Sequence, residues 1–313
     1  MVQEVAYTAR AARAATTGLF PGRARRPSPF AARVWRLPSV WFGLAVLAAL
    51  LLVALLAERI APGDPFATSR QVFLPPSARY FFGTDDLGRD LFRSTLHGTR
   101  VSLVVGVVVA TTAAAIGVVA GGVAGYAGGI ADDLLMRLAE LFQVIPRFFL
   151  ALVVVALFGS HLGVLVLLLG LTSWPGAARL VRGQVLSLRE REYVVAARAA
   201  GVPEGRILVR HVLPAALPPV VTHAALGVGG AILVEAGLSF LGLGDRNVIS
   251  WGGLLNDAQP FVRRVWWLSV FPGLAITLTV LGTNLLADGL NEAWNPRLRS
   301  LQTRRPRGRS RPT

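Results

Sequence analysis

Long apolar runs alternate with shorter polar segments along this chain. The runs cover residues 40–57, 101–131, 164–177, 217–241 and 268–286, and one more continues from the mixed segment 132–147 to about residue 158. A run of roughly 20 apolar residues is long enough to cross a bilayer as a helix. The pattern therefore predicts an all-α integral membrane protein with six transmembrane helices.

Arginine is concentrated in three places, because residues 1–39, 179–210 and 295–313 contain seven arginines each. Basic residues gather on the cytoplasmic side of membrane proteins. Six helices place all three clusters on that side, whereas five or seven would leave one tail outside. We therefore expect a disordered cytoplasmic tail that reaches the start of the first helix (1–39), a transmembrane domain (40–299) and a second cytoplasmic tail (300–313). Within the transmembrane domain we expect two extracytoplasmic loops (58–100 and 242–264) and one cytoplasmic loop (178–214).

Composition excludes several classes of function. The chain is 53% hydrophobic and 16% charged, whereas soluble chains contain about 25% charged residues. All 32 basic residues are arginine, so the lysine of a phosphate-binding Walker A loop is missing. The chain has no cysteine, which excludes disulfides and thiolate metal sites. The net charge of +15 has a simpler explanation in the cytoplasmic arginines than in nucleic-acid binding, because no basic face with interleaved aromatic residues is present.

The polar segment 192–214 has internal order. Small residues, including Ala196 and Ala197, are followed by Gly201 and then by Pro203 and Glu204. Glycine ends helices by adopting the left-handed conformation, and proline and glutamate suit the first turn of the next helix. The segment therefore predicts a helix–turn–helix at the membrane surface, which suits the docking of a soluble partner.

Glu235 is an ionisable residue inside the apolar run 217–241. A charge within a membrane helix is costly and normally faces protein or a water-filled path. Two interpretations stay open: a pathway or gate residue, and a structural partner of a neighbouring arginine or backbone group near the outer interface. No second intramembrane carboxylate is evident that would complete a proton relay.

Other features are interpreted as structural. Thr84 or Asp85 is expected to cap a helix. Pro146 can kink the third helix, and Arg147 at its foot is expected to reach the cytoplasmic surface. The pair Trp266–Trp267 fits an interfacial aromatic belt. Glycines recur every four residues where another helix can approach closely, at Gly117, Gly121, Gly125 and Gly129. The histidines lie far apart and predict no metal cluster: His97, His161, His211 and His223.

The segment 192–214 resembles the signature loop of permeases from bacterial ATP-binding-cassette importers. That pattern has Glu-Ala-Ala, three residues, Gly, and a later Ile-x-Leu-Pro, and this chain matches it at Ala196, Ala197, Gly201, Leu213 and Pro214. Val195 replaces the glutamate, and His211 replaces the isoleucine. Further matches resemble the second, C-type permease of the dipeptide, oligopeptide and nickel branch: FGTDDLGRDLF (82–92), TRVSL (99–103), DLLMR (133–137), LSFLGLG (238–244), SWGGLL (250–255), ADGL (287–290) and NPRLR (295–299).

This resemblance implies a type I importer permease fold and an assembly. A second, homologous permease would complete a heterodimeric pore in the membrane lipid, two cytoplasmic ATPase subunits would use ATP and Mg²⁺, and an extracytoplasmic binding protein would deliver the solute. This chain would bind no cofactor and catalyse no reaction. Three classes of solute stay open, namely short peptides, nickel chelates and sugar oligomers. The segment DRNVI (245–249) lacks the double proline of many peptide permeases, so the resemblance does not single out peptides.

The resemblance also implies site residues. The ATPase-docking loop would comprise Glu192, Ala196, Ala197, Gly201, Pro203, Glu204, Arg206, Arg210, His211 and Pro214. The binding protein would contact Asp85, Asp86, Arg89, Asp90, Asp245, Arg246 and Trp251. An ion-coupled secondary transporter is the alternative, which would need intramembrane charge pairs. A membrane-anchored scaffold without transport is a third possibility.

Overall fold

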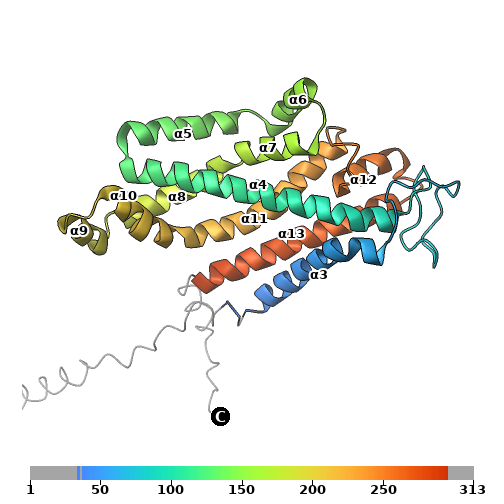
Figure 1. Cartoon of the computed structure of the whole chain (residues 1–313), viewed down its shortest axis with the longest axis horizontal. Coiled ribbons are helices and arrows are strands. Elements are labelled where there is room, and N and C mark those ends of the chain that lie inside the picture. Colours follow the sequence, from blue (N-terminus) through green and yellow to red (C-terminus); the bar gives the residue numbers. More distant parts are fainter. Residues whose placement is uncertain (1–33, 36, 295–313) are drawn as a thin grey trace, which may run out of the picture.

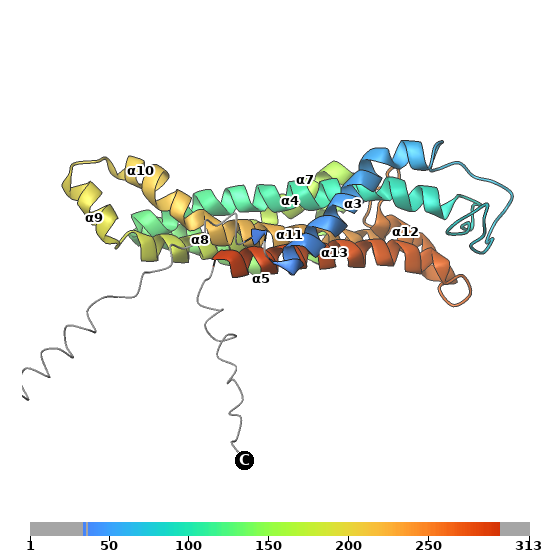
Figure 2. The same ribbon diagram turned by 90° about the horizontal axis from the view of Figure 1, so that it is seen from below.

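The computed structural model describes residues 34–35 and 37–294, and nearly all of its regular structure is helical. The helices form an elongated bundle along one long axis (Figures 1 and 2). Within the described residues, the only extended pairing is an isolated antiparallel bridge between Thr84 and Asp90. Of the predicted tails 1–39 and 300–313, residues 1–33, 36 and 300–313 lie outside the described part of the chain, and residues 38–39 begin α3.

Six segments are long and apolar enough to cross a membrane when one bent helix pair is counted as a single span. They are α3 (Pro38–Ile60), α4 (Leu91–Ala127), the bent pair α5 (Gly129–Val144) and α6 (Arg147–Phe158), α7 (Leu162–Thr172) with α8 (Trp174–Leu188), α10 (Glu204–Ile207) with α11 (Leu213–Phe240), and α13 (Trp267–Trp294). The predicted all-helical membrane fold is confirmed.

Glycine lets α4 approach α8 closely. A Cβ atom added at Gly117, Gly121 or Gly125 would lie only 2.4, 2.2 or 2.8 Å from an atom of α8. The predicted packing role of these three glycines is therefore confirmed. Gly129 does not belong to the stripe, because no atom lies within 4 Å of its added Cβ and it is the first residue of α5, with a φ of +53°.

The first long loop is shorter than predicted. Residues 61–90 form it, and 91–100, which were expected to be loop, are the start of α4. The helix cap is Asp90, whose carboxylate accepts a hydrogen bond from the Phe92 N–H at 2.9 Å, so the expectation for Thr84 or Asp85 was wrong. Thr84 instead braces the loop, because its hydroxyl donates to the Gln71 carbonyl at 2.7 Å.

The third predicted helix is broken at Pro146, and α5 and α6 meet there at 81°. Proline has no N–H and clashes with the preceding turn of a helix, which accounts for the break. Arg147 begins α6 and therefore follows all 16 residues of α5, or about 24 Å of helix. Arg147 therefore lies after the break in the helix and not at the foot of one straight helix, as was expected.

The predicted cytoplasmic loop 178–214 is mostly helical. Residues 178–188 continue α8, and only 189–191 separate α8 from the short helix α9 (Glu192–Ala199). After α10, a π-helical turn over Leu208–Val212 leads directly into α11. The second helix of the predicted helix–turn–helix therefore does not end near Pro214, because it is continuous with a membrane span.

The predicted loop 242–264 contains a helix of its own, α12 (Trp251–Ala258), followed by a 3₁₀ turn. Ser250 caps α12, and its hydroxyl accepts a hydrogen bond from the Gly253 N–H at 3.1 Å. Of the expected tryptophan belt, only Trp266 is exposed. Trp267 is buried and its indole N–H donates to the Thr84 carbonyl at 3.2 Å, which ties α13 to the loop 61–90.

Candidate functional site

Helices α9 and α10 project beyond the rest of the bundle at one end, which we call the docking end (Figures 1 and 2). The pair is anchored by apolar side chains rather than by backbone pairing. Val194, Ile207 and Val212 are fully buried and pack with Val181 and Val185 of α8. The segment is therefore a packed extension of the bundle, and a force applied to it reaches α8 and α11.

The turn between α9 and α10 depends on Gly201, whose φ is +77°. The Gly201 N–H bonds to the Arg198 carbonyl at 3.0 Å, and the Val202 N–H bonds to the Ala197 carbonyl at 3.1 Å. These are the two hydrogen bonds of a Schellman motif, in which the left-handed residue is usually glycine. Val202 and Ala197 also share the apolar cluster beneath the turn. The predicted role of Gly201 in ending the first helix agrees with this geometry.

A polar clasp closes the turn. Arg198 Nε donates to Glu204 Oε1 at 2.7 Å, and the Tyr126 hydroxyl at the end of α4 bonds to Glu204 Oε2. The hydrogen bond to Glu204 raises the pKa of Arg198 above its ordinary value. Glu204 was expected to interact with the dipole of α10, and its partners Arg198 and Tyr126 were not expected. Only the Arg198–Glu204 contact could have been suggested by the sequence, because the predicted helix–turn–helix brings residues 198 and 204 to the same turn.

Most of the predicted docking residues are exposed at this end. Arg206, Arg210 and His211 are exposed and form no ion pair within the described residues, so the two guanidinium groups carry unneutralised positive charge at this surface. Exposed apolar side chains lie among them, since Tyr193, Val195 and Val209 are 46%, 49% and 65% exposed. The remaining predicted residues are also exposed apart from Ala197, which is partly buried: Glu192, Ala196, Gly201, Pro203, Glu204 and Pro214.

A second ion pair stiffens the helices beneath this end. Arg182 of α8 donates to both carboxylate oxygens of Asp132 on α5, at 2.5 and 2.6 Å. Arg189 donates to the Gly125 carbonyl at 3.0 Å, at the end of α4. These links were not predictable from the sequence, because the paired residues are 50 and 64 positions apart.

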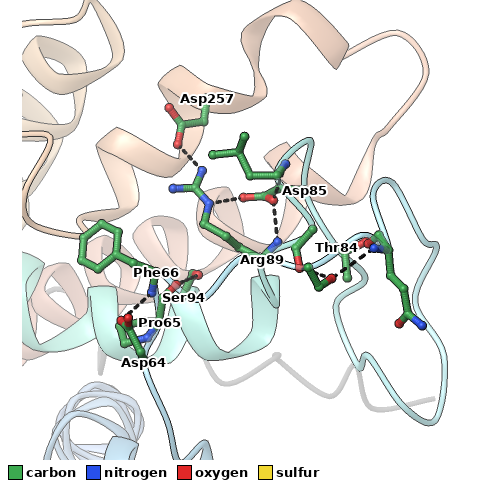
Figure 3. A network of polar contacts seen from close by, with 12 residues as sticks. Asp64, Pro65, Phe66, Thr84, Asp85, Arg89, Ser94 and Asp257 are labelled. Carbon is green, nitrogen blue, oxygen red and sulfur yellow. Dashed lines mark hydrogen bonds and ion pairs between the residues drawn. The ribbon is translucent and has the colours of Figure 1, made fainter.

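The opposite end of the bundle carries the loop 61–90 and α12, and Arg89 joins them (Figure 3). Its guanidinium pairs with Asp85 in the loop and, at 2.8 Å, with Asp257 of α12. Burial alone would lower the pKa of Arg89, but the two carboxylates raise it above its ordinary value. Asp85 also accepts the Arg89 backbone N–H at 2.8 Å, so Asp85 and Arg89 form an internal brace.

A pocket of about 460 Å³ lies beside this brace, which we call the outer pocket. Charged groups line it, namely Asp86, Arg89, Asp245, Arg246 and Asp257. Burial, followed by the charge of the neighbouring Asp85, raises the pKa of Asp86. Burial also acts to raise the pKa of Asp245, but hydrogen bonds from the backbone of Leu162 and Asn247 hold it below its ordinary value.

Glu235 lies in α11 close to this pocket and is only 1% exposed. Its Oε1 accepts hydrogen bonds from the hydroxyls of Ser239 at 2.7 Å and Ser250 at 2.9 Å, and both serines line the outer pocket. Its Oε2 has no hydrogen-bond partner among the described residues. Among the described residues no arginine pairs with Glu235, and the two serine hydroxyls bind its carboxylate instead.

Two residues expected at a binding surface have roles within the fold. Trp251 is fully buried, and its indole N–H donates to the Thr95 carbonyl at 3.1 Å. Asp90 caps α4. The structure therefore corrects the expectation that Trp251 contacts a partner. Among the described residues, no group of three or more His, Cys, Asp or Glu side chains is arranged to hold a metal ion.

Comparison with known proteins defines the family. Residues 117–300 match the model of the binding-protein-dependent transport system inner membrane component. This chain belongs to that family of importer permeases. It is 42% identical over 265 residues to the dipeptide transport system permease protein DppC of Escherichia coli, covering 82% of this chain and 88% of the relative.

Two further relatives agree with this assignment. A putative peptide transport system permease of Brucella suis is 40% identical over 271 residues, covering 86% of this chain and 91% of the relative. DppC of Alkalihalophilus pseudofirmus is 39% identical over 260 residues, covering 82% and 86%. The chain is thus a multi-pass membrane permease subunit of an ATP-binding-cassette importer, and the resemblance inferred from its motifs is confirmed. The family is one of transport subunits, not of enzymes.

Proposed function

We propose that this permease imports short peptides as one half of a heterodimeric pore. The relatives named above are dipeptide or peptide permeases, which favours that solute over nickel chelates and sugar oligomers. In this proposal a second, homologous permease completes the pore, two cytoplasmic ATPase subunits consume ATP with Mg²⁺, and an extracytoplasmic binding protein supplies the peptide.

The observation that carries the proposal is the projecting α9–α10 pair. Buried valine and isoleucine side chains anchor the pair, and its surface exposes Tyr193 and Val195, with Val209 exposed just after α10, near arginines that form no ion pair among the described residues. An exposed apolar patch with a polar rim is typical of a protein-binding surface. We assign this surface to the ATPase subunits, and with it the docking end and both chain termini to the cytoplasm.

The opposite end would then face the binding protein. Asp86, Asp245 and Arg246 line an accessible pocket there and suit contact with a delivered solute or its carrier. Asp85, Arg89 and Asp90 would support this surface from within, because they brace the loop and cap α4. Glu235 would act as a gate residue, since rupture of its bond to Ser250 would release α11 from the start of α12, whereas its bond to Ser239 lies within α11.

Single cysteines test this assignment, because the chain has none of its own. Ala199→Cys places a thiol on the exposed face of α9, and Thr68→Cys places a matched, exposed thiol in the loop 61–90. We expect an impermeant maleimide to label Ala199→Cys only in inside-out vesicles and Thr68→Cys only in right-side-out vesicles. A short crosslinker should join Ala199→Cys, but not Thr68→Cys, to an ATPase subunit in the intact complex.

Labelling of Ala199→Cys from outside the cell would reject the docking assignment. Peptide uptake that persists without ATP and collapses with the proton gradient would reject the importer mechanism in favour of a secondary transporter.

A further inference from the structure

A second pocket, of about 230 Å³, lies halfway along the membrane-spanning helices, and we call it the midspan pocket. Residues 109–114 line it from the middle of α4, and residues 223–234 line it from the middle of the continuous helix that α10 and α11 form. Its wall is otherwise made of small and apolar residues such as Ala110 and Gly227. A pocket at this depth is positioned to meet a solute during passage, because transport sites commonly lie near the bilayer midplane.

Three polar side chains face this otherwise apolar space. Arg147 comes from the start of α6, Ser173 from the break between α7 and α8, and His223 from α11. No acidic residue is among those that line the pocket. Among the residues that the structure describes, Arg147 forms no ion pair. An ionisable residue at membrane depth with no internal partner is a candidate functional residue.

The bend at Pro146 explains why this arginine is here. A straight helix through residues 129–158 would have no free end at this depth, but the 81° bend starts a new helix, α6, at Arg147. The first turn of α6 has no side-chain cap. Unpaired N–H groups and the positive end of the helix dipole at such a terminus favour an anion. The guanidinium of Arg147, the N-terminus of α6 and the imidazole of His223 thus all favour an anion, because each offers hydrogen-bond donors.

We propose that the midspan pocket binds the free carboxylate of the transported solute, with Arg147 as the principal ligand and Ser173 and His223 as supporting donors. This proposal rests on the proposed function in peptide import, because the terminal carboxylate is the anion common to short peptides. Arginine binds carboxylates through two parallel hydrogen bonds. The pocket is smaller than the roughly 300 Å³ lower limit of pockets that enclose a whole ligand, so it suits one end of a peptide.

The test compares the equilibrium binding of a dipeptide and of its C-terminal amide to the intact complex in lipid nanodiscs, without the binding protein. Ligand-observed NMR measures both affinities. Omitting the binding protein keeps its own selectivity out of the result. We expect the wild type to bind the free acid about tenfold or more tightly than the amide, since one charge-assisted pair is lost. Arg147→Gln should abolish this preference, and Arg147→Lys should keep most of it.

Arg137→Gln is the matched control, because Arg137 is exposed on α5, forms no ion pair among the described residues and does not line the pocket. It should bind like the wild type. Equal affinity of the wild type for the acid and the amide, no detectable binding of either, or an unchanged preference in Arg147→Gln would overturn the site.

ATP-driven uptake in proteoliposomes separates this proposal from the proposed function. Dipeptide import at equal rates by wild type and Arg147→Gln would refute the site and leave peptide import standing. Absence of ATP-driven dipeptide import by the wild type would refute peptide import, and with it the ligand assigned to the pocket.

Discussion

Replacement of Gly201 by valine tests whether the turn between α9 and α10 transmits force. Gly201 has a φ of +77°, and no atom lies within 4 Å of an added Cβ. The cost of a side chain here is therefore backbone strain and not a clash. A left-handed conformation costs an L-residue about 1–2 kcal/mol, and more when the residue is β-branched. Valine should shift the turn out of this conformation and break the two hydrogen bonds of the Schellman motif.

Gly205 provides the matched control, because it is equally exposed and equally open around its Cβ but is helical. Valine is a better helix former than glycine, so Gly205→Val should not strain the backbone. Gly201→Asn should fall between the wild type and Gly201→Val, since asparagine tolerates the left-handed region better than other residues.

Two measurements in proteoliposomes decide the outcome. One is peptide uptake, and the other is ATP hydrolysis stimulated by the loaded binding protein. We expect Gly201→Val either to lose copurification with the ATPase subunits or to hydrolyse ATP with little uptake. Normal uptake and coupling in Gly201→Val would refute the role of the turn. Equal damage from Gly205→Val would show that crowding at the docking surface, and not backbone strain, is responsible.

Two further predictions concern the helix packing and the buried glutamate. Gly121→Ala should lower the melting temperature of the purified complex, because its Cβ would lie 2.2 Å from the Ala178 carbonyl oxygen. Overpacking of this kind costs about 1–3 kcal/mol. Gly183→Ala is the control and should not lower the melting temperature, because no atom lies within 4 Å of its added Cβ. Glu235→Ala should destabilise by about 1–3 kcal/mol because two buried serine hydroxyls lose their acceptor, whereas Glu235→Gln keeps an acceptor oxygen and should melt close to the wild type. Equal melting temperatures within either pair would contradict the packing or hydrogen-bonding argument.

The sequence was sufficient for the parts of the fold that depend on local patterns. Apolar run length located the spans, and the spacing of Gly117, Gly121 and Gly125 identified a close helix contact without naming α8 as the partner. The turn at Gly201 was also predictable, because a glycine followed by proline and glutamate encodes a helix end and a helix start within a few residues.

Features that depend on tertiary contacts could not be predicted. Glu235 is bound by Ser250, 15 residues away, and Tyr126 reaches Glu204 across 78 positions. Trp251 lies in a glycine-rich segment that resembles a loop, yet it is fully buried, because the fold places it against α4. A single sequence contains no signal for such pairings.

The break at Pro146 is an intermediate case. Proline marked a possible kink, but the size of the bend depends on how α6 packs against α7. The charged residues of α5 suggested the foot of one straight helix, so the start of a separate helix at Arg147 was not expected. The periodicity of side chains describes which face of a helix is apolar, and it does not describe where along the membrane normal a broken helix resumes.

One continuous helix connects the three regions discussed above. The segment Glu204–Phe240 has 37 residues, or about 55 Å of helix, and it begins at the docking end and passes the midspan pocket before it reaches Glu235. Its hydrogen-bond ladder is interrupted at the π-helical turn and again at Pro218 and Pro219. Under the proposed coupling, bending would therefore concentrate in the half nearest the ATPase subunits. His223 follows Pro219 by four residues, so movement of the docking end would change its position relative to Arg147, and with it the shape of the carboxylate site.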